Sequence, residues 1–153
     1  QMHSLQHGVR VIEFQTPHYE RMIVMFGQKV LTQDHWNTEE ALAGMKPEVY
    51  QPPQPELIWQ RDGVCCERVV NFPDFDAFRL SIPAGKRIQL EGKGNYQLLM
   101  GVEGYGQLLV GGESCGTVRH EEGWMIPAVT DDCWLESRGT GDLICLQAIP
   151  KSS

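Results

Sequence analysis

Short apolar runs separated by turn residues dominate the chain from Glu56 onward. These runs recur about every ten residues, and glycine, proline, aspartate or asparagine stands between them. No helical period of about 3.6 residues persists through them, so the pattern favours short antiparallel β-strands over helices. The strands that it predicts are residues 57–59, 64–70, 78–82, 87–91, 97–102, 107–110, 116–119, 124–126, 133–136 and 143–148.

Glycines interrupt the central strands at positions where strands usually avoid them. Gly101, Gly104 and Gly106 follow one another closely within this apolar region. Glycine inside a strand typically marks a sharp bend or a close approach of another backbone, as at the corners of a small barrel. The pair Gly111 and Gly112 is a hairpin signal between two strands.

The first fifty residues have a different pattern. Residues 9–15 alternate well enough to predict a strand, and residues 21–25 and 29–32 are two further short apolar segments. A short helix is predicted within residues 35–45, because Asn37 and Glu40 have capping-box spacing in front of good helix formers.

A proline-dense stretch, residues 51–55, separates these two regions. Proline-rich segments are stiff and extended, and they often join two structural units. We therefore predict an N-terminal arm of strands and one short helix (residues 1–50), a linker (51–55) and a barrel (56–150). The predicted fold class is all-β, with the many short strands forming a jelly-roll barrel.

Composition excludes several classes of partner. Hydrophobic residues make up 41% of the chain and charged residues 22%, which is ordinary for a globular domain. The net charge of −7 and the lack of a basic cluster argue against nucleic acid as a partner. No apolar run approaches the ~18 residues needed to span a bilayer, so we expect no membrane partner.

The five cysteines are odd in number and lack C-x-x-C spacing, which predicts reduced, mostly packed thiols in a cytoplasmic protein.

Two short motifs in the barrel region resemble those of a known family. Val-Glu-Gly-Tyr-Gly at residues 102–106 and Gly-Trp-Met-Ile-Pro-Ala at 123–128 resemble the two signature turns of cupins. More narrowly, residues 74–150 resemble the C-terminal cupin domain of type I phosphomannose isomerases. This resemblance implies a cupin jelly-roll barrel.

The barrel departs from the pattern of metal-binding cupins. Residues 94–97, Gly-Asn-Tyr-Gln, stand where the family has its His-x-His pair, and Asp132 stands at the histidine position of the second motif. His120 lies in a charged stretch, and we expect it to be solvated. We therefore predict no catalytic metal in the barrel, and no zinc in the 153-residue chain. A sugar could be held at the barrel mouth by four side chains: Tyr96, Gln97, Tyr105 and Trp124.

The N-terminal arm resembles the last signature of the catalytic cupin in the same isomerases. The matching residues are His3-Ser4-Leu5, Gly8-Val9, Glu13-Phe14-Gln15 and Tyr19-Glu20-Arg21, with one residue inserted in the family's Tyr-Arg pair. The resemblance implies that His3 is a zinc ligand, that Arg21 faces the sugar phosphate, and that Glu13 belongs to the catalytic set. The family's other zinc ligands come from sequence ahead of His3. Glu13 and Arg21 can equally form an ordinary cross-strand ion pair.

Three functional hypotheses follow. The first is that the chain is the C-terminal part of a longer, zinc-dependent mannose-6-phosphate isomerase-like protein, and is inactive alone. The second is a metal-free cupin that binds a sugar or another small polar ligand without catalysis. The third is a structural domain. Because the apolar segments of residues 1–45 need to be covered, we also expect a homodimer.

Overall fold

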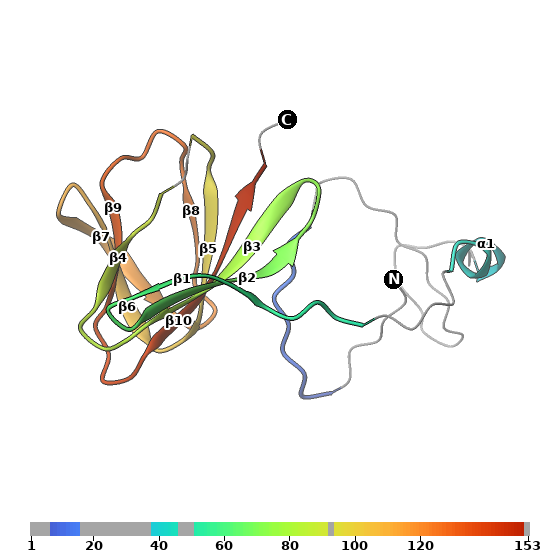
Figure 1. Ribbon diagram of the computed structural model, residues 1–153, viewed down its shortest axis with the longest axis horizontal. Coiled ribbons are helices and arrows are strands. Elements are labelled where there is room, and N and C mark those ends of the chain that lie inside the picture. Colours follow the sequence, from blue (N-terminus) through green and yellow to red (C-terminus); the bar gives the residue numbers. More distant parts are fainter. Residues whose placement is uncertain (1–6, 16–37, 46–50, 92–93, 152–153) are drawn as a thin grey trace. The chain divides into compact units, whose positions relative to one another are not determined.

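The computed structural model describes residues 7–15, 38–45, 51–91 and 94–151 (Figure 1). The chain divides into two compact units, Gln1–Gln51 and Pro52–Ser153. The first unit contains helix α1 (Thr38–Ala43), within the predicted helical segment. Glu39 and Glu40 lie in its first turn, where negative charge is favourable. Among the described residues, no helix has both the length and the apolar character needed to cross a bilayer.

The strand predicted for residues 9–15 is wrong. The segment follows a turn at His7 and Gly8 and has no regular secondary structure. Val9 and Val11 are each 55% exposed. Alternating residues form a stable strand only when a neighbouring strand pairs with them, and this segment has no strand partner within the described residues. The predicted cap residue Asn37 and the apolar segments 21–25 and 29–32 lie outside the described residues.

The second unit is built from ten β-strands, and every strand predicted for it is confirmed. They are β1 (Glu56–Arg61), β2 (Val64–Asn71), β3 (Phe75–Ile82), β4 (Arg87–Gln89), β5 (Gln97–Glu103), β6 (Tyr105–Val110), β7 (Glu113–Arg119), β8 (Gly123–Ile126), β9 (Cys133–Ser137) and β10 (Leu143–Pro150). The hairpin between β6 and β7 turns at Gly111 and Gly112, whose φ angles are 59° and 83°. Two positive φ angles are what a tight type I′ turn requires.

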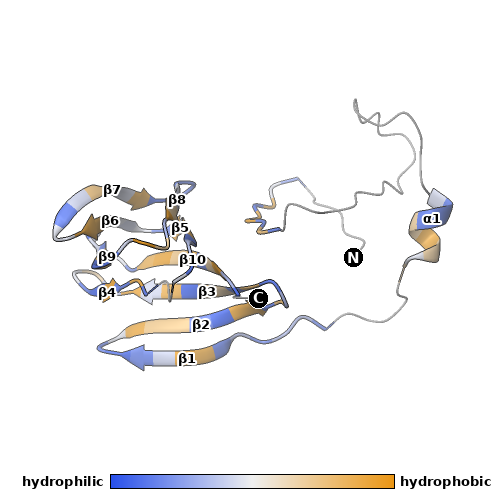
Figure 2. Ribbon diagram, turned by 90° about the horizontal axis from the view of Figure 1, so that it is seen from above, coloured by the Kyte–Doolittle hydropathy of each residue, from blue (hydrophilic) through white to orange (hydrophobic). Residues whose placement is uncertain are grey.

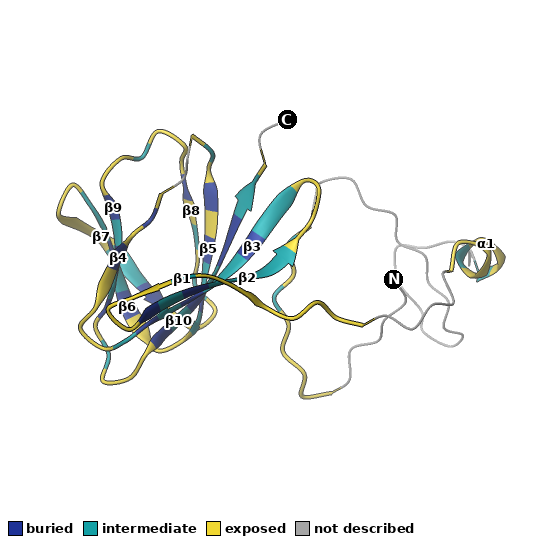
Figure 3. Ribbon diagram, in the orientation of Figure 1, coloured by how far each residue is buried: buried dark blue, intermediate teal, exposed yellow. Residues whose placement is uncertain are grey.

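Two antiparallel sheets face each other and enclose the core. One sheet has six strands in the order β1-β2-β3-β10-β5-β8, and the other has four in the order β4-β9-β6-β7. Short hydrophobic and hydrophilic stretches follow one another along strands such as β2 (Figure 2), and the buried positions lie within the strands of both sheets (Figure 3). The most deeply buried side chains include Leu80, Ile82, Leu99, Val118, Leu135 and Leu143. This is the architecture of the predicted jelly-roll barrel.

Glycines allow close backbone approach both between the two sheets and within one of them. A methyl group on Gly101 of β5 would lie 2.6 Å from the carbonyl carbon of Arg119 on β7, in the other sheet. One on Gly106 of β6 would lie 2.7 Å from the carbonyl oxygen of Glu136 on β9, the neighbouring strand of the same sheet. The Gly101 amide donates to Glu122 O at 3.1 Å, and the Glu121 amide donates to Gly101 O at 3.3 Å. The close approach predicted from these glycines is confirmed. We call this region, from Gly101 to Glu122, the glycine end of the barrel.

Trp124 joins the edges of the two sheets near the glycine end, where β8 of one sheet meets β7 of the other; we call this junction, together with the Gly101 contact, the seam. Trp124 lies on β8, the edge of the six-stranded sheet, and its Nε1 donates to Thr117 O on β7, the edge of the other sheet, at 2.9 Å. Its ring covers Gly116, where an added methyl group would lie 2.5 Å from Cη2. The indole therefore holds the seam closed.

Replacing Gly101 with alanine should lower the free energy of unfolding by about 2–3 kcal/mol, because the new methyl group meets rigid backbone rather than a movable side chain. Chemical denaturation measures this loss.

The matched control is Gly141→Ala. Nothing lies within 4 Å of a methyl group at Gly141, so this variant should stay within about 0.5 kcal/mol of the original protein. Equal stability of the two variants would contradict the proposed seam.

All five cysteines are free thiols, as predicted, and most are packed. Cys66, Cys133 and Cys145 are buried, Cys65 is partly buried and Cys115 is exposed. Burial raises the pKa of the Cys66 thiol to about 11 and that of Cys145 to about 12. A raised thiol pKa keeps the reactive thiolate scarce at moderately alkaline pH.

Alkylation of the native protein at pH 9 should therefore modify Cys115 first and leave Cys66 and Cys145 protected. Only the thiolate reacts, and both buried thiols stay protonated until well above this pH. Peptide mass spectrometry after timed quenching identifies the order, with urea-unfolded protein as the control in which all five cysteines react. Cys145 reacting as fast as Cys115 would show that the core is open.

Candidate functional site

A row of side chains crosses the inner face of the six-stranded sheet. Gln147 on β10 is opposite Phe78 on β3, and Phe78 is opposite Arg68 on β2. Residues directly opposite each other in antiparallel strands share a face. This is the core face, because Phe78 packs against the hydrophobic core. The row therefore places an amide, an aromatic ring and a guanidinium next to one another; we call it the inner row.

Gln97 adds a second amide beside Gln147. Gln97 is 2% exposed and Gln147 is 6% exposed, and Gln147 Nε2 donates to Gln97 Oε1. Each primary amide has two N–H donors and a carbonyl with two lone pairs, so one bond leaves donors and acceptors unused whichever way the amides are turned. Among the described residues, Asp76 Oδ1 is the sole fully buried side-chain N or O atom without a hydrogen bond. The unused amide atoms of the pair therefore keep some contact with solvent.

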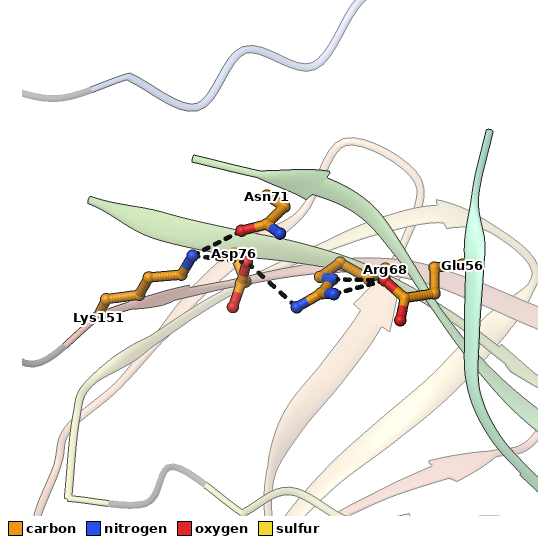
Figure 4. Close-up of polar contacts among 5 residues, drawn as sticks. All are labelled: Glu56, Arg68, Asn71, Asp76 and Lys151. Atoms are coloured by element: carbon orange, nitrogen blue, oxygen red, sulfur yellow. Dashed lines mark hydrogen bonds and ion pairs between the residues drawn. The ribbon is translucent and has the colours of Figure 1, made fainter. Parts of the chain in front are cut away.

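At the Arg68 end of the inner row, charged side chains of opposite sign form a network (Figure 4). Arg68 donates from Nε to Glu56 Oε2 at 3.1 Å and forms an ion pair with the same oxygen at 2.5 Å; this hydrogen bond raises the pKa of Arg68. Asp76 Oδ1 lies 4.0 Å from Arg68 Nη1 and 3.2 Å from Lys151 Nζ. Lys151 also donates to Asn71 Oδ1 at 2.7 Å. Two carboxylates and two cations balance, so the network attracts neither anions nor cations strongly.

A polar hollow lies at the end of the barrel where β5 begins and β8 ends, which we call the amide end. Its volume is about 280 Å³, and its lining includes Gly94, Pro127, Thr130 and Asp131. Gly94 lies three residues before Gln97, and Pro127 follows Ile126, the cross-strand partner of Gln97. The buried amide pair and the hollow therefore lie at the same end of the barrel.

Asp132 stands where the resemblance to metal-binding cupins would place a histidine. Its Oδ1 accepts a hydrogen bond from Trp134 Nε1 at 2.7 Å, and its backbone φ is 49°. In the part of the chain that the structure describes, no three His, Cys, Asp or Glu side chains are grouped to hold a metal ion. His120 has a side chain that is 46% exposed and lies 3.4 Å from Glu121 Oε1.

The four side chains predicted to hold a sugar are not at one place. Gln97 is inside the barrel, and Tyr96, next to it, is 47% exposed. Tyr105 begins β6, beyond the far end of β5, and is 42% exposed. Trp124 is engaged with Gly116 and the Thr117 carbonyl. Gln97 and Tyr96 therefore belong to the amide end, whereas Tyr105 and Trp124 lie toward the glycine end.

The predicted catalytic set lies in the other unit. His3 and Arg21 are outside the described residues. Glu13 is exposed, in the irregular segment 7–15. Their roles therefore remain predictions from the family resemblance.

Sequence reasoning missed Gln147, Phe78 and Arg68. Gln147 was the one detectable signal, because it is a polar residue at a core-facing position of the apolar strand β10. The positions of Phe78 and Arg68 beside it depend on strand register, which the local pattern does not give.

Comparison with known proteins gives a fold but no family. No protein-family model matches the sequence, and no curated protein matches it. Among solved structures, a cupin-superfamily sugar phosphate isomerase from Silicibacter pomeroyi matches 60% of this chain and 61% of its own, with a TM-score of 0.52 and 13% identity. An RmlC-like cupin from Shewanella frigidimarina matches 65% of this chain and 86% of its own, with a TM-score of 0.53 and 14% identity.

A third solved structure, KdgF from Halomonas sp., matches 63% of this chain and 89% of its own, with a TM-score of 0.53 and 15% identity. The barrel has the cupin fold. The chain spans less than two thirds of the Silicibacter isomerase, and at these identities the likeness establishes the cupin architecture alone.

Proposed function

We propose that this cupin barrel binds a small neutral polyhydroxylated ligand, such as a sugar, at its amide end. The observation that carries the proposal is the Gln97–Gln147 pair, which keeps unused donors and acceptors among the mostly apolar buried side chains of the barrel. Buried polar groups in proteins nearly always have partners, so an incompletely paired amide couple with solvent contact is suited to a ligand.

The chemistry of the inner row suits a sugar. Sugar hydroxyls both donate and accept hydrogen bonds, which matches the mixed capacity of two primary amides. Phe78 offers an apolar face next to them for the ring carbons. Since the charges around Arg68 balance, a neutral ligand fits this row better than an anion.

Replacing both Gln97 and Gln147 with leucine should abolish sugar binding and leave the fold at least as stable. Replacing both partners of a buried hydrogen bond with apolar groups of similar shape leaves protein stability nearly unchanged or raises it. The single variant Gln147→Leu should lower affinity about tenfold or more and also lower stability, because it leaves Gln97 without its partner. Isothermal titration with a set of neutral hexoses, together with urea denaturation, measures both effects.

Gln60→Leu is the matched control, because Gln60 is exposed on β1 and its change leaves the amide pair intact. Binding that survives in the double variant, or that falls equally in Gln60→Leu, would refute the proposal.

A second candidate function concerns a longer protein that contains this chain. We propose that such a protein isomerises a hexose 6-phosphate with zinc, as the phosphomannose isomerase resemblance implies. Two observations support it: the motif containing His3, Glu13 and Arg21, and the cupin fold shared with a sugar phosphate isomerase. The 153 residues alone would lack activity, because a zinc site needs three or four ligands.

In the longer protein, Arg21→Ala should lower kcat by about 10²–10³ while the fold is retained, because a preorganised cation that stabilises developing negative charge is lost. His3→Ala should instead reduce zinc content, since the metal loses a ligand. Coupled assays of mannose 6-phosphate isomerisation and elemental analysis measure the two effects. A folded, zinc-loaded longer protein that is inert on hexose 6-phosphates would exclude this function and leave sugar binding by the barrel unaffected.

A further inference from the structure

The outer face of the four-stranded sheet carries a groove of about 390 Å³ that is separate from the inner row. On β9, Cys133, Leu135 and Ser137 are buried, so Trp134 and Glu136 lie on the opposite, outward face. Arg87 on β4 is opposite Glu136, and Leu109 on β6 is opposite Trp134. These side chains line the groove together with Gly112, Asp132 and Arg138.

Arg87 is the exposed cation of this groove, and it is held in place by an aromatic ring. Its guanidinium carbon lies 4.6 Å from the centroid of the Trp134 ring. Stacking on an indole fixes the plane of a guanidinium and leaves its in-plane N–H donors free. Within the described ranges, Arg87 has no hydrogen-bond acceptor and no carboxylate partner. By contrast, Arg68, Arg79, Arg119 and Arg138 each pair with a glutamate.

The rest of the groove offers acceptors and an apolar surface. Arg138 Nη2 lies 3.0 Å from Glu136 Oε2, and this pair holds both side chains in place while Arg138 keeps other donors. Asp132 Oδ1 accepts a hydrogen bond from the Trp134 indole N–H, so the other carboxylate oxygen of Asp132 can accept a hydrogen bond from a ligand. Leu109 and the Trp134 ring supply apolar contact. Two arginines and two carboxylates line the groove, so its formal charges balance as they do around Arg68. The difference is local: among the described residues Arg138 is paired with Glu136, whereas Arg87 stacks on the indole without a carboxylate partner.

We propose that this groove binds a monosaccharide that carries one anionic group, either a phosphate or a carboxylate. The anion is held by the Arg87 fork, the sugar ring lies against Trp134 and Leu109, and its hydroxyls donate to Asp132 and Glu136. Arginine forks match the planar oxygen pairs of both anions. The volume is within the range of small-ligand sites and suits one sugar unit. The groove lies on the outside of the other sheet and contains no residue of the inner row, although Asp132 lines both the groove and the hollow at the amide end.

The test is titration of the 153-residue chain at low ionic strength with glucose 6-phosphate, glucuronate, glucose and inorganic phosphate, followed by calorimetry. One or both anionic sugars should bind, and which of them binds identifies the phosphate or the carboxylate as the recognised group. Arg87→Ala should weaken that binding about tenfold or more, since charge-assisted hydrogen bonds are lost. Arg61→Ala, an exposed arginine on β1, removes the same charge elsewhere and should have little effect.

Three results would overturn the proposal. They are no binding of either anionic sugar at about 10 mM, equal losses in Arg87→Ala and Arg61→Ala, and binding of inorganic phosphate as tight as that of the sugars. The double leucine variant of Gln97 and Gln147 should bind the anionic sugar unchanged. This last result separates failure of the groove from failure of the inner site.

Discussion

The barrel depends on the close approach of two backbones at Gly101. The β5 strand of one sheet exchanges hydrogen bonds with the turn that follows β7 of the other sheet, and only glycine leaves room for the Arg119 carbonyl there. Trp124 then bridges the two sheet edges a short distance away. Because β7 and β8 are consecutive strands in different sheets, this seam holds together one of the places where the chain crosses between the sheets.

Polar and apolar side chains occupy different ends of the barrel interior. On β5, the inward positions run from Gln97 through Leu99 to Gly101, and on β10 Cys145 is paired with Gly101 while Gln147 is opposite Leu99. The glycine end is thus filled by backbone, the Cys145 thiol and aliphatic side chains such as Val118 and Leu143, and the polar amides lie at the other end. Inside the barrel, the amide end therefore offers the Gln97 and Gln147 side chains to a ligand with hydroxyl groups. The outer groove is a consequence of the same alternation, because its residues occupy the outward positions of the second sheet.

The sequence alone was enough to predict where the strands of the barrel lie, but it was not enough to predict which residues form the candidate site. All ten strands follow from local alternation and turn residues, which act over a few positions, and the role of Gly101 follows from its placement in a strand. The N-terminal segment 9–15 shows the limit of this reasoning, because its alternating valines are exposed and irregular. Trp124 was predicted to line a sugar site, yet its indole holds the seam. Gln147 lies beside Gln97 although 50 residues separate them, and such pairing depends on register between distant strands.

The central claim is that Gln97 and Gln147 hold a neutral sugar at the amide end. The most direct measurement follows the side-chain amide signals of these two glutamines by nitrogen-15 NMR while a neutral hexose is added to the 153-residue chain. The account predicts that both pairs of signals shift together and saturate at one common affinity, while the side-chain amide of Gln60 stays in place. Signals of Gln97 and Gln147 that remain unchanged at saturating sugar would contradict it.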